Sequence, residues 1–421
     1  MRTRFGFRRT VWIVAGCVAA GAALNGTAPL ATPRGAVVVA APPPGAAVPV
    51  LTGNAPPTPP PAAGPPSPAF VPRTFTLLGA GDILLHPGLW RQGQADARAR
   101  GHSGYDFDPL FASAVADISG ADIAICHLET PLGTPSGPFT GFPTFKVPPQ
   151  IARSIHDVGY DTCSTASNHS LDGGQAGVVR TLDALDAAGV KHTGTARSAR
   201  EAATVDLIRL PNGVRVAQLS YAFGFNGAIR PADKPWLANR IDVKAILAAA
   251  HRAKQAGADV VVVSLHFGTE YRQSPNPQQL SVVRALLASP DVDLILGCHA
   301  HVVQPLQEIN GKWVAYGMGN QVATQPFSKP TQDGLMVRFT FSETAPGKFR
   351  VSRAEAIPTF MYQGQDGGPT RLIDIPAELR KPGLSAARRA LYVESWKRTA
   401  REVDAMGAAK DGLIVVGGAL V

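Results

Sequence analysis

Five short polar segments of this sequence each follow an apolar, strand-like run. They combine aspartate, glutamate, asparagine and histidine, and they are Gly81-Asp82, His127-Leu128-Glu129, Ser167-Asn168-His169, His266-Phe267-Gly268-Thr269-Glu270-Tyr271 and Gly297-Cys298-His299-Ala300-His301. Carboxylates, amides and imidazoles together form a ligand mixture that suits first-row metals such as Mn, Fe and Zn. Polar residues at strand ends line clefts rather than fill interiors. We therefore expect these segments to form most of a two-metal hydrolase site.

The strongest single feature is the pair His299 and His301. Residues two apart face the same side of an extended strand, and this pair follows the apolar run 294–296. A lone histidine there is more often a core residue, but two imidazoles beside the other candidate ligands favour metal binding. His266 closes the β-branched run 260–265, and Gly268 behind it permits the close backbone approach that a crowded site needs.

Two carboxylates lie at the ends of predicted strands. Asp82 follows the run 77–81, and Glu129 follows the run 123–128. Open α/β sheets bind ligands at this edge. A carboxylate placed between two ions can bridge them, and we assign that role to Glu129.

Asn168, His169 and Asp172 share one turn after the run 161–167. Asparagine and aspartate also cap helices, and a helical pattern follows this turn. Capping alone does not account for the histidine, so we interpret Asn168 and His169 as functional. Asp172 is compatible with either role.

The elements that position these residues alternate along the chain. Strand-like runs at 75–78, 122–126, 214–219, 260–265 and 292–296 are separated by amphipathic patterns around 178–185, 243–250 and 280–287. This alternation predicts an α/β domain. Two later runs, 313–316 and 335–341, are less interleaved with helices, which suggests antiparallel pairing and a second sheet. A long helix is predicted at 385–406, and the apolar end 413–421 is either a docked strand or a loose tail.

The N-terminal part differs in composition from the rest. Residues 1–73 hold six arginines and no lysine, aspartate or glutamate. Residues 74–421, the body of the chain, therefore carry +3 of the formal net charge of +9. We find no cluster of basic residues in the body, which argues against a nucleic-acid partner. Arginines followed by the apolar run 11–24 indicate a signal peptide or signal anchor over 1–41. Residues 42–72, rich in Pro, Ala and Gly, predict a semi-extended linker.

The export route stays open between general secretion, twin-arginine export through Arg8-Arg9 and lipidation of Cys17 in a lipobox-like setting. With Cys17 in the leader, the body keeps an odd number of cysteines, Cys126, Cys163 and Cys298. We therefore expect no disulfide framework. Each of the three lies in a strand-like run, where cysteine usually acts as a small buried hydrophobic residue.

The segments resemble the CapA (poly-γ-glutamate capsule synthesis) family of the calcineurin-like metallophosphoesterase superfamily from about Phe75 to Gln321. The resemblance is carried by Gly81-Asp82, Leu128-Glu129, Ser167-Asn168-His169 with Asp172, the 266–271 motif, Gly297-x-His299-x-His301-Val302-x-Gln304 and Gly319-Asn320. It implies a metallophosphatase-type four-layer α/β/β/α sandwich over residues 73–365. A C-terminal helical extension and tail would then occupy 366–421.

The same resemblance implies a role for each motif residue. Two divalent ions would be held, one by Asp82 and His301, the other by Asn168, His266 and His299, with Glu129 as the bridge. His169 would protonate the leaving group, with Asp172 as the second candidate catalytic residue. The expected substrate contacts are Lys146, Glu270, Tyr271 and Asn320, although a solvated surface lysine also fits Lys146.

Two positions depart from the superfamily pattern. Its first motif is Asp-x-His, whereas Ile83-Leu84 follow Asp82 here, which removes one imidazole. The bridging position is glutamate, and the family's Asn-Leu-Glu appears as His127-Leu128-Glu129.

We expect an exported bacterial hydrolase, secreted or anchored at the cell surface or membrane, that attacks a phosphoester or amide with two divalent ions. The resemblance directs the substrate prediction to poly-γ-glutamate or another anionic surface polymer. The alternative is a non-catalytic surface factor that binds or helps to export such a polymer, and the departure in the first metal motif favours it. A nucleotide phosphodiesterase is compatible with the superfamily but has no support from the charge distribution.

Overall fold

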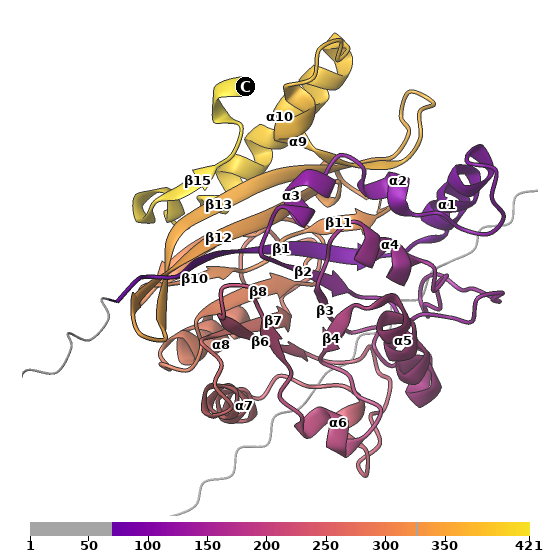
Figure 1. Ribbon diagram of the computed structural model, residues 1–421. Helices are drawn as coiled ribbons and strands as arrows, with labels where there is room; N and C mark the ends of the chain where they lie inside the picture. Colours follow the sequence, from indigo (N-terminus) through magenta and orange to yellow (C-terminus); the bar gives the residue numbers. More distant parts are fainter. Residues whose placement is uncertain (1–69, 326) are drawn as a thin grey trace, which may run out of the picture. The chain divides into compact units, whose positions relative to one another are not determined.

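A computed structural model describes residues 70–325 and 327–421 (Figure 1). The predicted leader, 1–41, and residues 42–69 of the predicted linker lie outside this part. The described chain forms two β-sheets that carry helices on their outer sides. Within these residues, no helix is both long enough and apolar enough to cross a membrane.

The first sheet has nine strands within the described residues, in the order β14-β13-β12-β1-β2-β3-β4, with β11 paired to β1 and β15 paired to β13. The strand β1 is parallel to β2 and antiparallel to β12, so it joins a parallel half to an antiparallel half. The strands are β1 Thr74–Leu84, β2 Ile123–Leu128, β3 Thr162–Ser164, β4 Lys191–Thr193, β11 Asn320–Ala323, β12 Asp333–Ala345, β13 Lys348–Tyr362, β14 Arg371–Asp374 and β15 Leu413–Val415.

The second sheet has six strands in the described part of the chain, in the order β5-β6-β7-β8-β10-β9. Its inner strands β6, β7, β8 and β10 are parallel, and the edge strands β5 and β9 are antiparallel to their neighbours. The strands are β5 Leu207–Arg209, β6 Arg215–Ala222, β7 Val260–His266, β8 Leu294–Cys298, β9 Leu306–Ile309 and β10 Lys312–Ala315.

The helices carry polar caps where the sequence supplies them. Asp242 accepts a hydrogen bond from the Ala245 N–H at the start of α7, and Asn276 with Gln279 forms a capping box on α8. The helices are α1 Pro87–Ala99, α2 Asp108–Phe111, α3 Val115–Ser119, α4 Ile151–Asp157, α5 Gly174–Ala188, α6 Ala199–Ala203, α7 Val243–Gln255, α8 Pro277–Leu287, α9 Ile375–Leu379 and α10 Ala386–Val403. Short 3₁₀ turns occupy Pro235–Leu237, Lys329–Thr331, Ala408–Asp411 and Gly418–Leu420.

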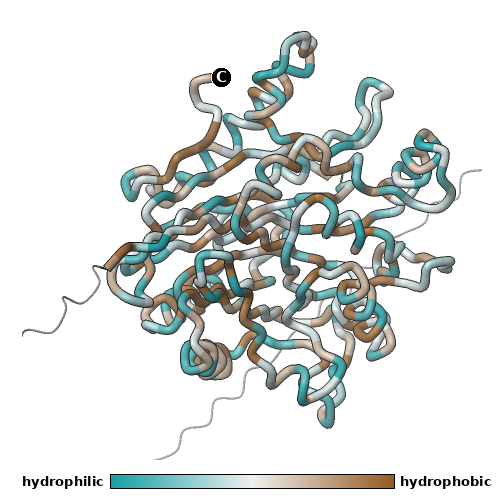
Figure 2. The backbone as a smooth tube through the Cα atoms, viewed as in Figure 1, coloured by the Kyte–Doolittle hydropathy of each residue, from teal (hydrophilic) through white to brown (hydrophobic). Residues whose placement is uncertain are grey.

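The four layers follow from the alternation of side chains along the strands. In β1, Phe75 and Leu77 pack between the two sheets, whereas Leu78 and Ala80 pack under helices α1 to α5. Helices α7 and α8 cover the outer face of the second sheet. Strands covered on both faces are apolar along their length, and Figure 2 shows hydrophobic residues along the inner strands. The predicted α/β/β/α sandwich is confirmed.

The later strands are divided between the two sheets. The predicted run 313–316 becomes β10, which is parallel to β8, and the run 335–341 becomes β12, which is antiparallel to β1 and β13. Antiparallel pairing is confirmed for both runs, because β10 is antiparallel to β9 and β12 is antiparallel to β1 and β13. A second sheet is also present, but the two runs lie in different sheets. Each run extends a sheet that earlier strands begin, and local patterns do not specify which sheet it joins.

The C-terminal residues pack on the first sheet. The predicted long helix is α10, and it contacts β12 and β13 through a cluster that includes Phe360 and Tyr392. The end of the chain forms the docked strand β15, parallel to β13, and then a 3₁₀ turn. The division between a body at 73–365 and an extension at 366–421 stays a prediction.

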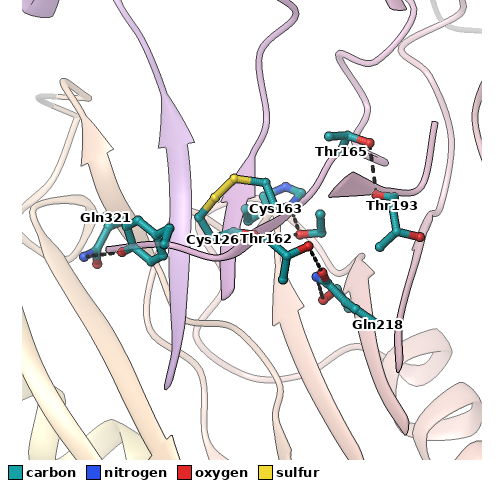
Figure 3. The surroundings of a disulfide bond; sticks show 11 residues. Cys126, Thr162, Cys163, Thr165, Thr193, Gln218 and Gln321 are labelled. Carbon is teal, nitrogen blue, oxygen red and sulfur yellow. Dashed lines mark hydrogen bonds between the residues drawn. A yellow bond between two sulfur atoms is a disulfide. The ribbon is translucent and has the colours of Figure 1, made fainter. Parts of the chain in front are cut away.

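Cys126 and Cys163 form a disulfide bond between β2 and β3 (Figure 3). The prediction of unpaired cysteines is therefore wrong for these two, and it holds for Cys298, which is free and buried. The two strands are parallel with Cys126 opposite Cys163 in register, so both side chains lie on one face with Cα atoms 4.5 Å apart. That separation lies within the range that disulfides span.

Candidate metal centre

The predicted ligands lie at the carboxyl ends of strands from both sheets. They come from β1 (Asp82), the residue after β2 (Glu129), the turn after β3 (Asn168), the end of β7 (His266) and the turn after β8 (His299 and His301). All six side chains are buried, with 4% or less of their surface exposed. The structure therefore brings the predicted ligands together in one interior cluster.

Backbone contacts hold the two sheets together at this edge. A Cβ at Gly81 would overlap the carbonyl oxygen of Gly319, which accepts a hydrogen bond from the Asp82 N–H at 2.9 Å. Gly297 is equally crowded by backbone, and its carbonyl accepts from the Met318 N–H at 3.0 Å. Glycine is required at both positions because another backbone segment lies where a side chain would stand. The segment between β10 and β11 thereby ties Asp82 to the histidine turn.

Asp82, Glu129 and His301 form the first group of candidate ligands, with one donor atom from each within 4.8 Å of the others. His301 Nδ1 lies 3.0 Å from Asp82 Oδ2, and His301 Nε2 lies 3.8 Å from Glu129 Oε1. Both carboxylate oxygens of Glu129 are buried without a hydrogen-bond partner in the described residues. A buried carboxylate without partners is costly, so the donor set fits a cation.

The charges of this group are strongly coupled. Burial raises the pKa of Glu129 well above its usual value. Burial alone would lower the pKa of His301, but the Glu129 and Asp82 carboxylates raise it to about 9. For Asp82, burial opposes ionisation, yet the hydrogen bond and charge of His301 lower its pKa. Two buried carboxylates facing one imidazole create a position that favours positive charge.

Asn168, His266 and His299 form the second group. His266 Nε2 lies 2.9 Å from Asn168 Oδ1, and the rings of His266 and His299 have centroids 4.6 Å apart. Among the described atoms, His299 Nδ1 has no hydrogen-bond partner although it is buried, and burial lowers the pKa of His299 to about 3. Its φ of 100° is unusual for a residue with a side chain. Neutral imidazoles with an amide oxygen fit a first-row metal.

His169 and Asp172 are in direct contact. His169 Nδ1 lies 2.8 Å from Asp172 Oδ2, which also accepts a hydrogen bond from the Phe145 N–H at 2.7 Å. The Phe145 ring packs edge-on against the imidazole, 4.8 Å between centroids. Helix α5 begins without a side-chain cap, so the capping alternative for Asn168 and Asp172 is wrong. Asp172 instead holds the ring of His169.

The expected substrate contacts lie in different settings. Glu270 is exposed and has a carboxylate oxygen within 4.8 Å of nitrogens of His299 and His301. Tyr271, which is 43% exposed, has its ring 6.0 Å from that of His301. Lys146 is half-buried next to Phe145, and its backbone pairs with Thr140. Its contact with substrate stays a prediction.

Asn320 does not contact the surface. Its side chain is fully buried: Oδ1 lies 3.1 Å from His301 Nδ1, and Nδ2 donates to the carbonyl oxygens of His301 and Thr331 and to Gln325. Because every polar atom of this amide is engaged inside the protein, it orients His301. Its contact with substrate stays a prediction.

His127 belongs to the cluster, although from the sequence it was placed in a site segment without being assigned a role. Its ring lies between Ser164 and His266, with Nε2 3.9 Å from Asp82 Oδ1. A donor atom of His127 is also within 4.8 Å of Asp82 and Cys298. His127 and Glu129 are two residues apart, so the spacing that marked His299 and His301 would have revealed His127 as well.

The fold and this cluster define a two-sheet α/β protein with a candidate metal centre at the strand ends. Residues 76–325 match the family of the bacterial capsule synthesis protein PGA_cap, and the chain belongs to this family. The predicted resemblance to the CapA family is thus confirmed.

Two capsule biosynthesis proteins are among the relatives that this chain resembles. The capsule biosynthesis protein CapA of Bacillus anthracis is 26% identical over 246 residues, which cover 58% of each chain. The PGA biosynthesis protein CapA of Bacillus subtilis (strain 168) is 28% identical over 204 residues, 48% of this chain and 53% of the relative. The chain thus spans less than two thirds of the length of these relatives.

Solved structures give distant likenesses. The calcineurin-like phosphoesterase YfkN from Bacillus subtilis matches 79% of this chain and 98% of its own, with a TM-score of 0.43 and 14% identity. The NAD nucleotidase NadN of Haemophilus influenzae matches 81% of this chain and 68% of its own, with a TM-score of 0.42 and 10% identity. Likenesses this distant carry no information about activity.

Proposed function

We propose that the protein is a metal-dependent hydrolase that acts on an anionic polymer of the cell surface, with poly-γ-glutamate as the first candidate. The observation that supports this most strongly is the buried carboxylate of Glu129. It has no hydrogen-bond partner among the described residues and lies within 4.8 Å of ligand atoms of Asp82 and His301. The polymer is suggested by the relatives, one of which is named a PGA biosynthesis protein.

The ligands divide between two ions, of Mn, Fe or Zn. Asp82 and His301 would hold the first, Asn168, His266 and His299 would hold the second, and Glu129 would be the shared ligand. When bound, such ions polarise the oxygen of a scissile phosphoester or amide and acidify an attacking water. Leu84 occupies the sequence position of the missing imidazole, and the exposed Glu270 offers an anionic oxygen near His299 and His301.

His169 supplies the proton for the leaving group. Asp172 accepts a hydrogen bond from His169 Nδ1–H, which fixes the ring and leaves Nε2 as the nitrogen that exchanges a proton with the leaving group. The Phe145 ring packs edge-on against the imidazole and shields it from water. On the same loop, Lys146 would pair with a carboxylate of the polymer.

A non-catalytic polymer-binding factor is the second candidate function. Leu84 in place of an imidazole favours it, because the first group then offers fewer protein ligands. A relative from Mycobacterium tuberculosis (strain ATCC 25618 / H37Rv) is named a probable polyglutamine synthesis accessory protein, which is compatible with such a role. In this alternative, the cluster would serve structure or polymer contact.

We also propose that the protein works outside the cytoplasm, at the cell surface. The Cys126–Cys163 disulfide supports this, because disulfides persist in oxidising compartments. The capsule-associated relatives support a surface location as well. Pulse labelling followed by protease treatment of intact cells tests the proposal, since a protein that resists protease until the cells are lysed would contradict it.

Metal content and turnover test the proposed function together. The full-length protein, purified without chelator, should contain about two ions per chain, and it should cleave a phosphoester or a γ-glutamyl amide from a panel with added Mn²⁺. The His299→Ala/His301→Ala variant should lose both metal and turnover. Unchanged metal content in that variant would contradict the assigned centre. Two bound ions with no turnover across the panel would favour the polymer-binding factor.

A further inference from the structure

A chain of hydrogen-bonding groups leads from the second ligand group into the first sheet. His266 engages both ring nitrogens: Nε2 lies 2.9 Å from Asn168 Oδ1, and Nδ1 lies 2.9 Å from His127 Nε2. His127 Nδ1 in turn lies 2.8 Å from Ser164 Oγ, and Ser164 Oγ donates to the Cys126 carbonyl oxygen at 3.3 Å. Both imidazoles are buried, with 3% or less of their surface exposed.

The Cys126 carbonyl, at the end of this series of hydrogen bonds, fixes which atom donates in each of them. A backbone carbonyl accepts hydrogen bonds and donates none, so the Ser164 proton is used on Cys126. Ser164 Oγ must then accept from His127 Nδ1–H. A neutral imidazole carries one N–H, which leaves His127 Nε2 as the acceptor for His266 Nδ1–H. It follows that His266 Nε2 presents a lone pair on the side of Asn168.

A charged His127 fits this environment poorly. A buried imidazolium is costly unless it is hydrogen-bonded to a carboxylate. The nearest carboxylate oxygen on this ring, Asp82 Oδ1, lies 3.9 Å from Nε2, beyond hydrogen-bond distance. The neutral arrangement therefore satisfies Ser164, both ring nitrogens of His127 and Nδ1 of His266. It leaves two acceptors, His266 Nε2 and Asn168 Oδ1, 2.9 Å apart, as two ligands of one cation would be.

We propose that His127 is a positioning residue for the metal centre. It accepts the Nδ1 proton of His266 and holds His266 in the tautomer whose Nε2 lone pair binds the ion shared with Asn168. Histidine ligands usually need such a partner on the second ring nitrogen, which fixes ring orientation and raises ligand basicity. This inference rests on the metal-binding part of the proposed function and not on the identity of the substrate.

A direct ligand role for His127 is the competing explanation. A donor atom of His127 lies within 4.8 Å of Asp82 and Cys298. However, both ring nitrogens of His127 already have partners, Ser164 and His266. Direct ligation would break one of those contacts and leave a buried polar group unpaired.

Variants whose side chains differ in length separate the positioning role of His127 from a direct ligand role. The asparagine of His127→Asn ends near the position of Nδ1, so it reaches Ser164 and not His266. The longer side chain of His127→Gln can place an oxygen near His266 Nδ1. His192→Asn is the matched control. His192 lies in the edge strand β4, and its largely buried ring is bonded to Asp186 of α5 and to none of the candidate ligands.

Calorimetric titration of the full-length, metal-free protein with Zn²⁺ gives the first readout. We expect His127→Asn to weaken one Zn²⁺ site by about 10- to 100-fold. His127→Gln should recover most of that loss, and His192→Asn should match the wild type. A His127→Asn variant that binds Zn²⁺ with wild-type affinity would overturn this inference and leave the metal-binding proposal standing. Loss of an ion in both His127 variants would indicate a direct ligand and would also overturn it.

The tautomer of His266 gives a second readout that does not depend on any variant folding. In the wild-type, metal-free protein, ¹⁵N NMR of labelled histidines should show the proton of His266 on Nδ1. A proton on Nε2 would overturn the inference. A wild type that binds no Zn²⁺ would overturn the metal-binding proposal, and the inference with it, so the two failures are distinguishable.

Discussion

At the residue scale, the contact between His169 and Asp172 predicts how substitutions at these two residues lower kcat. His169→Ala should lower kcat by about 10²- to 10⁴-fold, because general acid catalysis contributes about that much. Metal content should not change, since His169 is outside both ligand groups. Asp172→Asn should cost less, because the ring stays in place but loses the carboxylate that stabilises its charge. Steady-state kinetics with metal analysis measures both, and equal activity in His169→Ala and the wild type would contradict the assignment.

The pKa of His301 predicts a pH dependence for the metal-free protein. The pKa of His301 is raised to about 9 in the folded state, against about 6.5 for an unperturbed histidine. A raised pKa contributes stability that is fully present below about pH 6.5 and is lost as the pH rises to about 9. Chelator-treated protein should therefore lose thermal stability between these values. The loss should be smaller in His301→Gln, and parallel curves for the two proteins would contradict the assignment.

At the element scale, the disulfide joins the two strands that lead to Glu129 and Asn168. The Cys126→Ala/Cys163→Ala variant should lose about 4 kcal/mol of unfolding free energy, from the loop entropy of a crosslink across 37 residues. It should also bind metal more weakly, since β2 and β3 are then joined by backbone hydrogen bonds without the covalent link. Urea unfolding and Zn²⁺ titration measure these effects.

The crosslink itself has an independent check. Mass spectrometry of an unreduced digest should show the peptides of Cys126 and Cys163 joined. Separate thiol peptides, or an unfolding free energy equal to that of the double variant, would contradict the pairing.

At the scale of the whole molecule, a buried ion pair ties α10 to the first sheet. Asp333 of β12 accepts hydrogen bonds from Arg398 at 2.8 Å and from Ser395 at 2.6 Å, and it is 3% exposed. Arg398→Met leaves this buried carboxylate without its cation, which should cost about 2 kcal/mol, below the range for a fully buried pair because Arg398 is partly exposed. Lys397→Met, on the exposed side of the same helix, should be near neutral.

The shape of the unfolding curve then addresses the domain prediction. If α10 and the sheet form one cooperative unit, Arg398→Met should shift a single urea transition without changing metal content. A separate early transition would instead support an independent extension at 366–421.

Much of the candidate centre was predictable because the signals are local. Polar residues at the ends of apolar runs marked the ligands, and alternating strand and helix patterns marked the α/β class. His127 was equally predictable from its spacing to Glu129. The paired cysteines and the burial of Asn320 were not, since both depend on which segments lie side by side.

The sequence by itself determined which residue types stand at the strand ends, and hence the candidate metal-binding chemistry. The tertiary structure alone decided that the late strands β10 and β12 join different sheets, that Cys126 meets Cys163, and that His127 supports His266 across 139 residues of chain. The physical reason is that periodicity encodes which face of a strand is buried. Strand partners are fixed by the packing of residues distant in sequence, which local patterns do not specify.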